Sequence, residues 1–340
     1  MANAPLLSIV IPCYNEEAVL PETAKRLEVL LDGLVSAGLC SAQSHVCFVD
    51  DGSRDRTWAL IQAYSTQSPR LQGLKLSRNR GHQNALIAGL FSVQGDVVIS
   101  VDADLQDDLN AMTVMLERYR DGYEIVYGIR DNRESDSVFK RGSAQAFYRL
   151  QEWMGIDVIY NHADYRLMSD RVIRHLREYG EVNLFLRGII PQLGFRTTSV
   201  PYTREARFAG ESKYPLGKML ALAFDGITSF SAAPLRYITI AGFFVALMSL
   251  VFGLWALAVK LGGDAIPGWA STVLPTYFLG GVQLLCTGII GEYLAKIYME
   301  TKGRPRFFVE ATTRQLPLSE DAPFPARYNM QQHEESKRRA

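Results

Sequence analysis

Two acidic residues, Asp102 and Asp104, follow a short apolar run and are separated by a single alanine. A β-strand directs alternate side chains to one face, so both carboxylates are expected to point the same way. Paired carboxylate oxygens suit Mg²⁺ or Mn²⁺, which can in turn bridge a diphosphate. Gln106 continues this face and offers a neutral oxygen. A solvated acidic loop is the simpler alternative, but the position directly after an apolar strand favours a metal site.

A second acidic cluster, Asp50-Asp51-Gly52-Ser53, follows another apolar run. A carboxylate at this position can accept an N–H from a pyrimidine base, and Gly52 permits close approach of the backbone. Taken singly, Asp50 or Asp51 could instead cap the helix that follows. The cluster therefore indicates a nucleoside site only in combination with its neighbours.

The third cluster, Pro12 to Glu16, follows the first apolar run of the chain. Tyr14 could stack on a base and Glu16 could bond near the base or ribose, while Asn15 alone could simply make a turn. The three clusters together predict a nucleotide-diphosphate pocket. The chain has neither a P-loop nor a GxGxxG motif at these positions, which disfavours an ATPase or a dehydrogenase.

Alternating strands and helices must position these clusters. Apolar runs predict strands at Leu6–Pro12, His45–Asp50, Leu71–Leu76, Asp96–Val101 and Glu124–Tyr127. Helical spacing predicts helices at Glu17–Ala37, Arg56–Tyr64, Gln83–Val93 and Met112–Tyr119, and a further helix around Val138–Met154. This order predicts an α/β fold with a mainly parallel, Rossmann-like sheet covered on both faces. Ligands of such sheets bind beyond the carboxyl ends of the strands, where the polar clusters fall.

Two long apolar stretches change the character of the chain after residue 230. Tyr237–Val259 and Ala265–Gly291 contain no Asp, Glu, Lys or Arg, and each exceeds the ~20 residues that cross a bilayer. A pair of buried core helices is the alternative, but uninterrupted stretches of this length rarely fit a soluble core. Basic residues cluster outside the pair, at Lys213, Lys218, Arg236, Lys296, Lys302, Arg304 and Arg306. This asymmetry predicts a two-helix hairpin with both soluble ends on the cytoplasmic side.

The overall composition excludes some partners and compartments. Lys and Arg together number 36, as do Asp and Glu, so no basic field recruits nucleic acid. The four cysteines form no CxxC pair, which is typical of a reducing compartment. The N-terminal segment lacks a basic n-region and is predicted to be a strand rather than a signal peptide.

Several motifs together resemble those of the family 2 glycosyltransferases with a GT-A fold. They are PCYNEE, VDDGS, SRNRGHQNALIAG, DADLQDD, HADYRLMS and GESKY, and the resemblance covers roughly residues 6–310. It is strongest to the polyprenyl-phosphate branch, which includes dolichol-phosphate mannose synthases and the bactoprenol (undecaprenyl-phosphate) glucosyltransferases. Of these, the bactoprenol glucosyltransferases are the most similar.

The resemblance implies roles for individual residues. It assigns Pro12, Tyr14, Glu16, Asp50 and Asp102 to the nucleotide, and Asp102, Asp104 and Gln106 to a Mg²⁺ or Mn²⁺ ion. It assigns Arg130, Arg207 and Lys213 to the lipid phosphate, with a further contact that falls on Lys140, Arg141 or Ser143. Arg207 and Lys213 could instead face anionic lipid headgroups, as basic residues beside a membrane often do. Asp104 and Asp164 are the implied catalytic residues.

The implied reaction transfers a hexose, most simply from UDP-glucose, to undecaprenyl or another polyprenyl phosphate for cell-envelope glycan modification. The resemblance implies a single inverting displacement by the acceptor phosphate. Asp164 resembles a proposed base, but it could instead orient the acceptor or pair with Arg166. His82 and His162 are interpreted as packing or capping residues. Another donor (GDP-mannose, UDP-GlcNAc or an aminoarabinose type) and a processive polysaccharide synthase are the alternatives, although no QxxRW motif is found.

We therefore expect a hexosyltransferase of the inner membrane whose catalytic domain faces the cytoplasm. The expected parts are a catalytic domain at 1–211, an amphipathic interface segment at 212–234, two transmembrane helices within 235–298 (about 237–259 and 268–291), and a partly disordered tail at 299–340. The resemblance is also compatible with a homo-oligomer, such as a tetramer.

Overall fold

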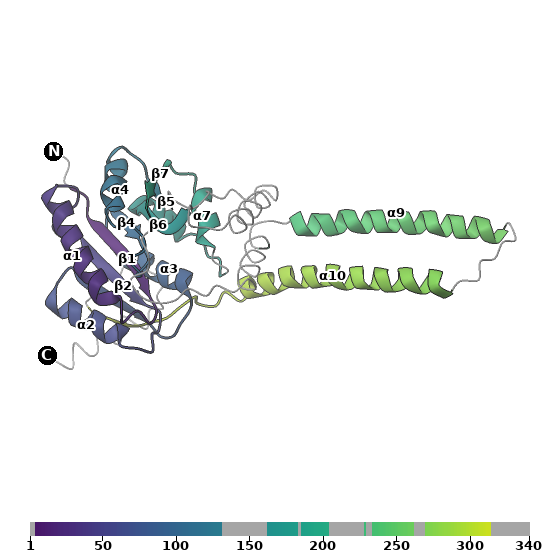
Figure 1. Cartoon of the computed structure of the whole chain (residues 1–340), viewed down its shortest axis with the longest axis horizontal. Helices are drawn as coiled ribbons and strands as arrows, with labels where there is room; N and C mark the ends of the chain where they lie inside the picture. The colour runs from purple at the N-terminus through teal and green to yellow at the C-terminus, as the bar shows by residue number, and fades with distance from the viewer. Residues whose placement is uncertain are drawn as a thin grey trace. The chain divides into compact units, whose positions relative to one another are not determined.

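A computed structural model describes residues 4–130, 162–182, 185–203, 228, 233–261 and 269–313. Contacts divide the chain into two units: one holds the sheet and its helices, and the other holds two long helices (Figure 1). Among the described residues, the sheet has eight strands in the order β7-β5-β6-β4-β1-β2-β3-β8. The strands are β1 (Leu7–Cys13), β2 (His45–Asp50), β3 (Leu71–Leu76), β4 (Val97–Ser100), β5 (Ile125–Arg130), β6 (His162–Ser169), β7 (Thr197–Tyr202) and β8 (Val309–Thr312).

The five strands expected from the sequence all form, at or near the expected residues. Strands β4, β1, β2 and β3 are mutually parallel neighbours, so their carboxyl ends meet at one edge of the sheet. Every residue of β1 is buried, which is typical of a central strand covered on both faces. The α/β fold with a largely parallel sheet is therefore confirmed.

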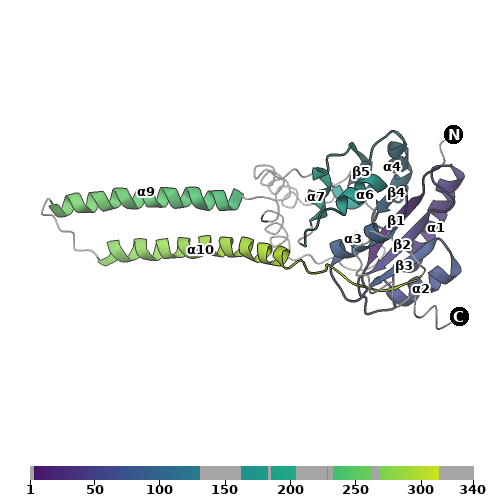
Figure 2. The ribbon, with the colours of Figure 1, turned by 180° about the vertical axis from the view of Figure 1, so that it is seen from behind.

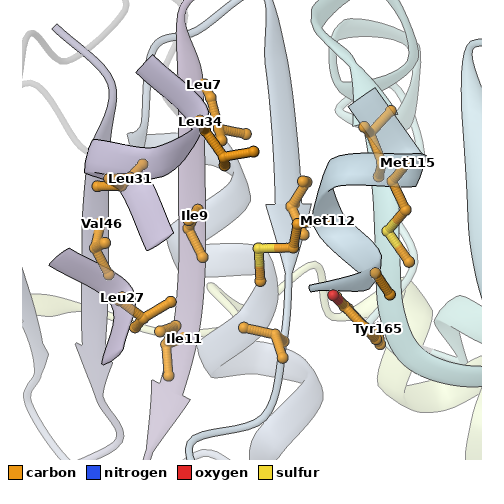
Figure 3. Packing of buried hydrophobic residues seen from close by; sticks show 14 of the residues in the cluster. Leu7, Ile9, Ile11, Leu27, Leu31, Leu34, Val46, Met112, Met115 and Tyr165 are labelled. Atoms are coloured by element: carbon orange, nitrogen blue, oxygen red, sulfur yellow. The ribbon is translucent and has the colours of Figure 1, made fainter. Parts of the chain in front are cut away.

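Helices cover both faces of this sheet. They are α1 (Leu20–Ser36), α2 (Thr57–Gln67), α3 (His82–Ser92), α4 (Ala111–Arg120), α6 (Asp170–Leu176) and α7 (Leu186–Gln192). Leu27, Leu31 and Leu34 of α1 pack on Leu7, Ile9 and Ile11 of β1, and Met112 and Met115 of α4 extend this core (Figure 3). These side chains recur at helical spacing along α1 and at every second position along β1, as their elements require.

Helix α3 covers the opposite face (Figure 2). A Cβ atom at Gly89 would lie only 2.4 Å from Cγ1 of Val10, so this helix approaches the strand closely because Gly89 has no side chain. Helices α6 and α7 are bonded to α3: Arg177 donates to Phe91 O, and the Leu186 amide donates to Gln83 Oε1. Both ends of α3 are therefore tied to segments far along the chain.

Three strands were not expected from the sequence. Strand β6 pairs antiparallel with both β4 and β5, β7 pairs parallel with β5, and β8 pairs antiparallel with β3 at the sheet edge. The sequence predicts no strand between residues 130 and 211, and β8 lies in the region expected to be a tail. The helix expected around Val138–Met154 lies outside the described residues, as does the interface segment expected at 212–234, apart from residues 228, 233 and 234.

The second unit consists of α9 (Ala233–Leu261) and α10 (Trp269–Thr301), which lie side by side (Figures 1 and 2). Within them, Ala233–Phe252 and Phe278–Thr301 are long and apolar enough to cross a membrane, and none of the tested window is buried. Large apolar side chains such as Phe243 and Leu284 are exposed, as on a surface that faces lipid. The expected pair of apolar helices is present.

Candidate active site

The loops that follow β1 and β2 are joined by hydrogen bonds. Asn15 Oδ1 accepts from the Arg54 amide at 2.9 Å, while the Asn15 amide donates to Ser53 Oγ at 3.0 Å. Asn15 adopts a φ of 57°, a left-handed conformation that asparagine tolerates better than most residues. Asn15 thus shapes the turn, as the simpler reading of the sequence held, and Tyr14 beside it is exposed.

Asp50 and Asp51 have different environments at the end of β2. Asp50 is fully buried; its Oδ1 accepts from the Ser53 amide, and its Oδ2 has no hydrogen-bond partner among the described residues. Burial raises the pKa of Asp50. The carboxylate of Asp51 accepts from the amides of Arg80 and Gly81 at 2.7 and 2.9 Å. Asp51 therefore holds the loop before α3, whereas Asp50 retains an acceptor oxygen that suits a base N–H.

Gly52 allows these two loops to meet. Its φ is +67°, and a Cβ atom would lie 2.6 Å from the backbone of both Arg78 and Asn79. No side chain fits such a contact with backbone atoms. The sequence predicts that the backbone at Gly52 makes a close approach, and in the structure it approaches the backbone of the loop before α3, at Arg78 and Asn79.

The Asp102–Gln106 segment follows β4 at the same edge of the sheet. The carbonyl of Ala103 accepts from Thr23 Oγ1 of α1 at 2.9 Å, and Asp104 Oδ1 accepts from the Gln106 amide at 3.2 Å. Desolvation raises the pKa of Asp102 to about 6, with the negative charges of Asp164, Asp107 and Asp104 adding to the effect, although 35% of its side chain is still exposed.

These residues suit a divalent cation, although the described parts of the chain hold no group of three or more His, Cys, Asp or Glu arranged as a metal site. Two carboxylates and one amide form an all-oxygen donor set of the kind Mg²⁺ and Mn²⁺ take. Burial is the main cause of the raised pKa of Asp102, and the charges of Asp164, Asp107 and Asp104 add to it; a bound cation would offset this second contribution. The assignment of Asp102, Asp104 and Gln106 to a metal remains a prediction.

His82, the first residue of α3, lies between two carboxylates of the site. Its Nε2 is 3.6 Å from Asp102 Oδ1 and 3.5 Å from Asp164 Oδ2. Burial opposes the charged ring, but the contact with Asp164 and the charges of Asp102 and Asp164 outweigh burial and raise the pKa of His82. The interpretation of His82 as a packing or capping residue therefore missed its position in the site. The side chain of His162 lies outside the described residues.

Asp164 on β6 is held by cations on several sides. It forms an ion pair with Arg166, and Arg187 Nη2 at the start of α7 lies 3.3 Å from its Oδ2. Burial favours its neutral form, but His82, Arg166 and Arg187 together lower the pKa of Asp164 well below its ordinary value. Asp164 is thus a firmly ionised carboxylate and a weak proton acceptor at neutral pH.

Arg130 at the end of β5 belongs to a separate group of polar side chains. Its Nε donates to Tyr202 Oη at 3.2 Å, and Tyr202 donates to the buried Asp107 at 2.6 Å. Asp102 and Asp107 contribute to the raised pKa of Arg130, so this group and the Asp102 carboxylate lie within electrostatic range of each other.

The fold thus brings together residues that the sequence assigned to the site. Those described are Pro12, Tyr14, Glu16, Asp50, Asp102, Asp104, Gln106, Arg130 and Asp164. Arg141, Ser143, Arg207 and Lys213 lie outside the described residues. Sequence reasoning missed Arg187 and Asp107. Asp107 could have been found, because it lies in the acidic run DADLQDD directly after Gln106. Arg187 could not, because its position in the sequence gives no indication that it lies beside Asp164.

Comparison with known proteins gives consistent matches along the chain. The family described as Glycosyl transferase family 2 matches residues 8–177. An uncharacterized glycosyltransferase, YkoT of Bacillus subtilis, is 50% identical over 91% of this chain and 92% of its own length. The bactoprenol glucosyl transferase of Shigella phage SfX is 37% identical over 90% of this chain and 99% of its own length. A mannosyltransferase from Pyrobaculum calidifontis, solved with GDP-Man and Mn²⁺, aligns at 16% identity over 87% of this chain and 85% of its own, with a TM-score of 0.43.

Proposed function

Because the chain belongs to glycosyl transferase family 2 and is a glycosyltransferase with a GT-A fold, we propose that it transfers glucose from UDP-glucose to a polyprenyl phosphate. One observation carries the proposal: acidic strand ends at one edge of a parallel sheet and two membrane-length helices occur in one chain. The relatives named bactoprenol glucosyl transferase match it along nearly its whole length, including these helices. Their name supports both a glucose donor and a prenyl phosphate acceptor.

The nucleoside is assigned to the edge formed by the ends of β1 and β2. The buried Oδ2 of Asp50, which has no hydrogen-bond partner within the described part of the chain, supports a bond to a base N–H, and the exposed ring of Tyr14 supports stacking on the base. Pro12 and Glu16 complete the assigned nucleoside contacts. The interlocked loops keep these residues in place without a glycine-rich phosphate loop.

The diphosphate is assigned to the end of β4. When bound there by Asp102, Asp104 and Gln106, a Mg²⁺ or Mn²⁺ ion would neutralise the diphosphate and stabilise it as a leaving group. The chain's own part is to hold these oxygen ligands, and the bond between Thr23 and Ala103 O fixes the backbone that carries them.

The acceptor phosphate is assigned to Arg130 together with Arg207, Lys213 and a contact from Arg141 or Ser143. A phosphate monoester is largely dianionic at neutral pH and needs cationic partners. An arginine fork binds two of its oxygens at once, and a lysine adds a mobile point charge. The position of Arg130 within electrostatic range of Asp102 supports this assignment.

The proposed reaction is a single displacement at the anomeric carbon. A phosphate oxygen of the acceptor forms the new bond to this carbon, the bond to the donor diphosphate breaks, and UDP leaves with the electron pair. The configuration inverts. The acceptor dianion becomes a monoanionic diester while UDP gains one negative charge, so no proton has to move.

This chemistry gives Asp164 an organising role rather than that of a base. The nucleophile is already ionised, and a carboxylate held by two arginines and a histidine accepts protons poorly. Its fixed negative charge keeps His82 beside Asp102 and holds Arg187 at 3.3 Å from its own Oδ2. Preorganised charges of this kind reduce the reorganisation needed in the transition state.

We place α9 and α10 across the inner membrane, with the catalytic domain on the cytoplasmic face. A polyprenyl phosphate keeps its headgroup at the interface, so an anchored enzyme searches for it in two dimensions. Protease treatment of sealed inverted vesicles tests this orientation: the catalytic domain should be digested. Protection of the domain in such vesicles would reverse the orientation.

The reaction is tested with the full-length protein in detergent, undecaprenyl phosphate and a panel of UDP-glucose, UDP-galactose, UDP-GlcNAc and GDP-mannose, with Mg²⁺ or Mn²⁺. Mass spectrometry should show the lipid gaining one hexose, with UDP-glucose as the best donor. Asp104→Ala is the matched inactive variant. A polymeric product, a water-soluble glycosylated acceptor, or full activity in excess chelator would refute the proposal.

A further inference from the structure

Arg130, Tyr202 and Asp107 each contact the other two, and these three contacts hold the Arg130 side chain in place. Its Nε–H donates to Tyr202 Oη at 3.2 Å, the Tyr202 O–H donates to Asp107 Oδ1 at 2.6 Å, and Arg130 Nη2 lies 3.8 Å from the same oxygen. Each hydrogen of the chain therefore has a defined direction, from the guanidinium through the phenol to the carboxylate. Such a chain polarises its members and strengthens each bond.

The three side chains differ in burial: Asp107 and Tyr202 are buried, as suits residues that hold a neighbour in place, and Arg130 is partly exposed, as suits a residue that binds a ligand. The side chain of Asp107 is 2% exposed and Tyr202 is buried, whereas 29% of the Arg130 side chain is exposed. A buried carboxylate is costly unless it is paired and hydrogen-bonded, so Asp107 strongly favours the arrangement that brings Arg130 and Tyr202 to it. The exposed part of the Arg130 side chain is left to meet a ligand.

The surrounding strands fix this group further. Arg130 and Tyr202 are direct neighbours in the parallel pairing of β5 with β7. Tyr165 packs edge-on against Tyr202 with ring centroids 5.3 Å apart, and its hydroxyl donates to Asp108 O at 3.1 Å. A Cβ atom at Gly128 would lie 3.0 Å from both tyrosine rings, so the absent side chain makes room for the pair.

We propose that Asp107 and Tyr202 are positioning residues that hold the guanidinium of Arg130 in the orientation that binds the acceptor phosphate. The inference rests on the proposed function and adds two residues that neither the motifs nor the comparisons assign. An arginine held in one orientation loses less conformational entropy when it binds a phosphate. Loss of the anchor should therefore weaken acceptor binding specifically and leave the nucleoside contacts on β1 and β2 intact.

The test is a double-mutant cycle in the full-length enzyme with undecaprenyl phosphate and the nucleotide-sugar found to be its donor. Tyr202→Phe removes only the hydroxyl, and we expect the acceptor KM to rise about tenfold, the usual size of a lost hydrogen bond to a charged group, with the donor KM unchanged. Asp107→Asn should act in the same direction. In an Arg130→Gln background, Tyr202→Phe should cause no further rise, because the group it positions is absent.

Tyr119→Phe is the matched control, since it also removes a tyrosine hydroxyl, one that donates to Asp96 O on the other side of the domain. It should leave both KM values unchanged. The inference is overturned if Tyr202→Phe retains the wild-type acceptor KM, if its effect adds in full to that of Arg130→Gln, or if both KM values rise together with a loss of thermal stability. A wild-type enzyme that ignores polyprenyl phosphate would overturn the proposed function, and this inference with it. A wild-type enzyme that uses it, with an unaffected Tyr202→Phe, would overturn the inference alone.

Discussion

Asp164 forms an ion pair with Arg166, two positions further along β6, and the guanidinium of Arg166 is completely buried. Alternate residues of a strand share a face, so the pair is a local consequence of β6. Within the described part of the chain, Nε and Nη1 of Arg166 have no hydrogen-bond partner. Asp164 is therefore the principal compensation for a buried positive charge.

Asp164→Ala should destabilise the protein by about 3–5 kcal/mol, because it leaves the buried charge of Arg166 uncompensated. Thermal unfolding in detergent measures the loss. Arg187→Ala is the control: Arg187 is 39% exposed, and its pair should contribute about 1 kcal/mol or less. An inactive Asp164→Ala protein with an unchanged melting temperature would contradict this prediction and support a general-base role instead.

Activity should fall as the pH drops below about 6, because Asp102, whose pKa is raised to about 6, must be ionised to bind a cation. A metal ion competes with the proton for this carboxylate, so more Mn²⁺ should move the acidic limb of the pH–rate profile to lower pH. If the midpoint of the acidic limb did not change over a wide range of Mn²⁺ concentration, ionisation of Asp102 would be excluded as the cause of this limb.

The same pKa shift predicts how stability depends on pH. The pKa of Asp102 is higher in the folded protein than the ordinary value of 3.8, so its stabilising effect is complete below about pH 4 and is lost as the pH rises through about 6. Asp102→Asn mimics the protonated form. It should melt above the wild type at pH 8 in metal-free buffer, with the difference vanishing near pH 4; equal melting temperatures at pH 8 would count against the raised pKa.

Gly52→Ala should abolish activity and destabilise the protein by more than about 1 kcal/mol, because the new Cβ atom meets the backbone of Arg78 and Asn79 and the φ is unfavourable. Gly33→Ala provides the contrast. Gly33 lies inside α1 with no atom within 4 Å of a new Cβ, so this change should stabilise by about 0.5–1 kcal/mol. Equal effects of the two substitutions on thermal unfolding would contradict the close contact at Gly52.

Thr313→Val should loosen the attachment of β8 to the sheet. Thr313 Oγ1 accepts from the Gly73 amide at 2.8 Å, and the loss of this acceptor should cost about 1–3 kcal/mol. Thr66→Val removes a hydroxyl that donates to Gln62 O on the exposed side of α2, and its effect should stay within about 0.5 kcal/mol. Hydrogen exchange of the Gly73 amide should rise in the first variant; unchanged protection there would show that the bond contributes little.

The first half of the fold could be predicted from the spacing of apolar residues within short stretches of the sequence. Strands β1 to β5 and helices α1 to α4 lie close to their expected residues, since each buries an apolar face whose period can be read from a few neighbouring positions. Strand β6 was missed because its HADYRLMS segment mixes charged and apolar residues. Arg166 is buried there only because Asp164 lies beside it, and that pairing depends on the strand having formed. Strand β8 was missed because its four residues gain their stability from β3, more than 230 positions earlier.

Which carboxylates end the central strands follows from the amino-acid sequence alone, because a parallel sheet places strand ends at one edge whatever the loops do. How each carboxylate is used depends on its partners in the folded domain. Asp51 accepts hydrogen bonds from the amides before α3, and Asp107 holds Arg130 through Tyr202. The negative charge of Asp164 is balanced by His82, Arg166 and Arg187. These partners come from elements far apart in the chain, and the charge state of an acid depends on the groups that surround it in space rather than on its neighbours in sequence.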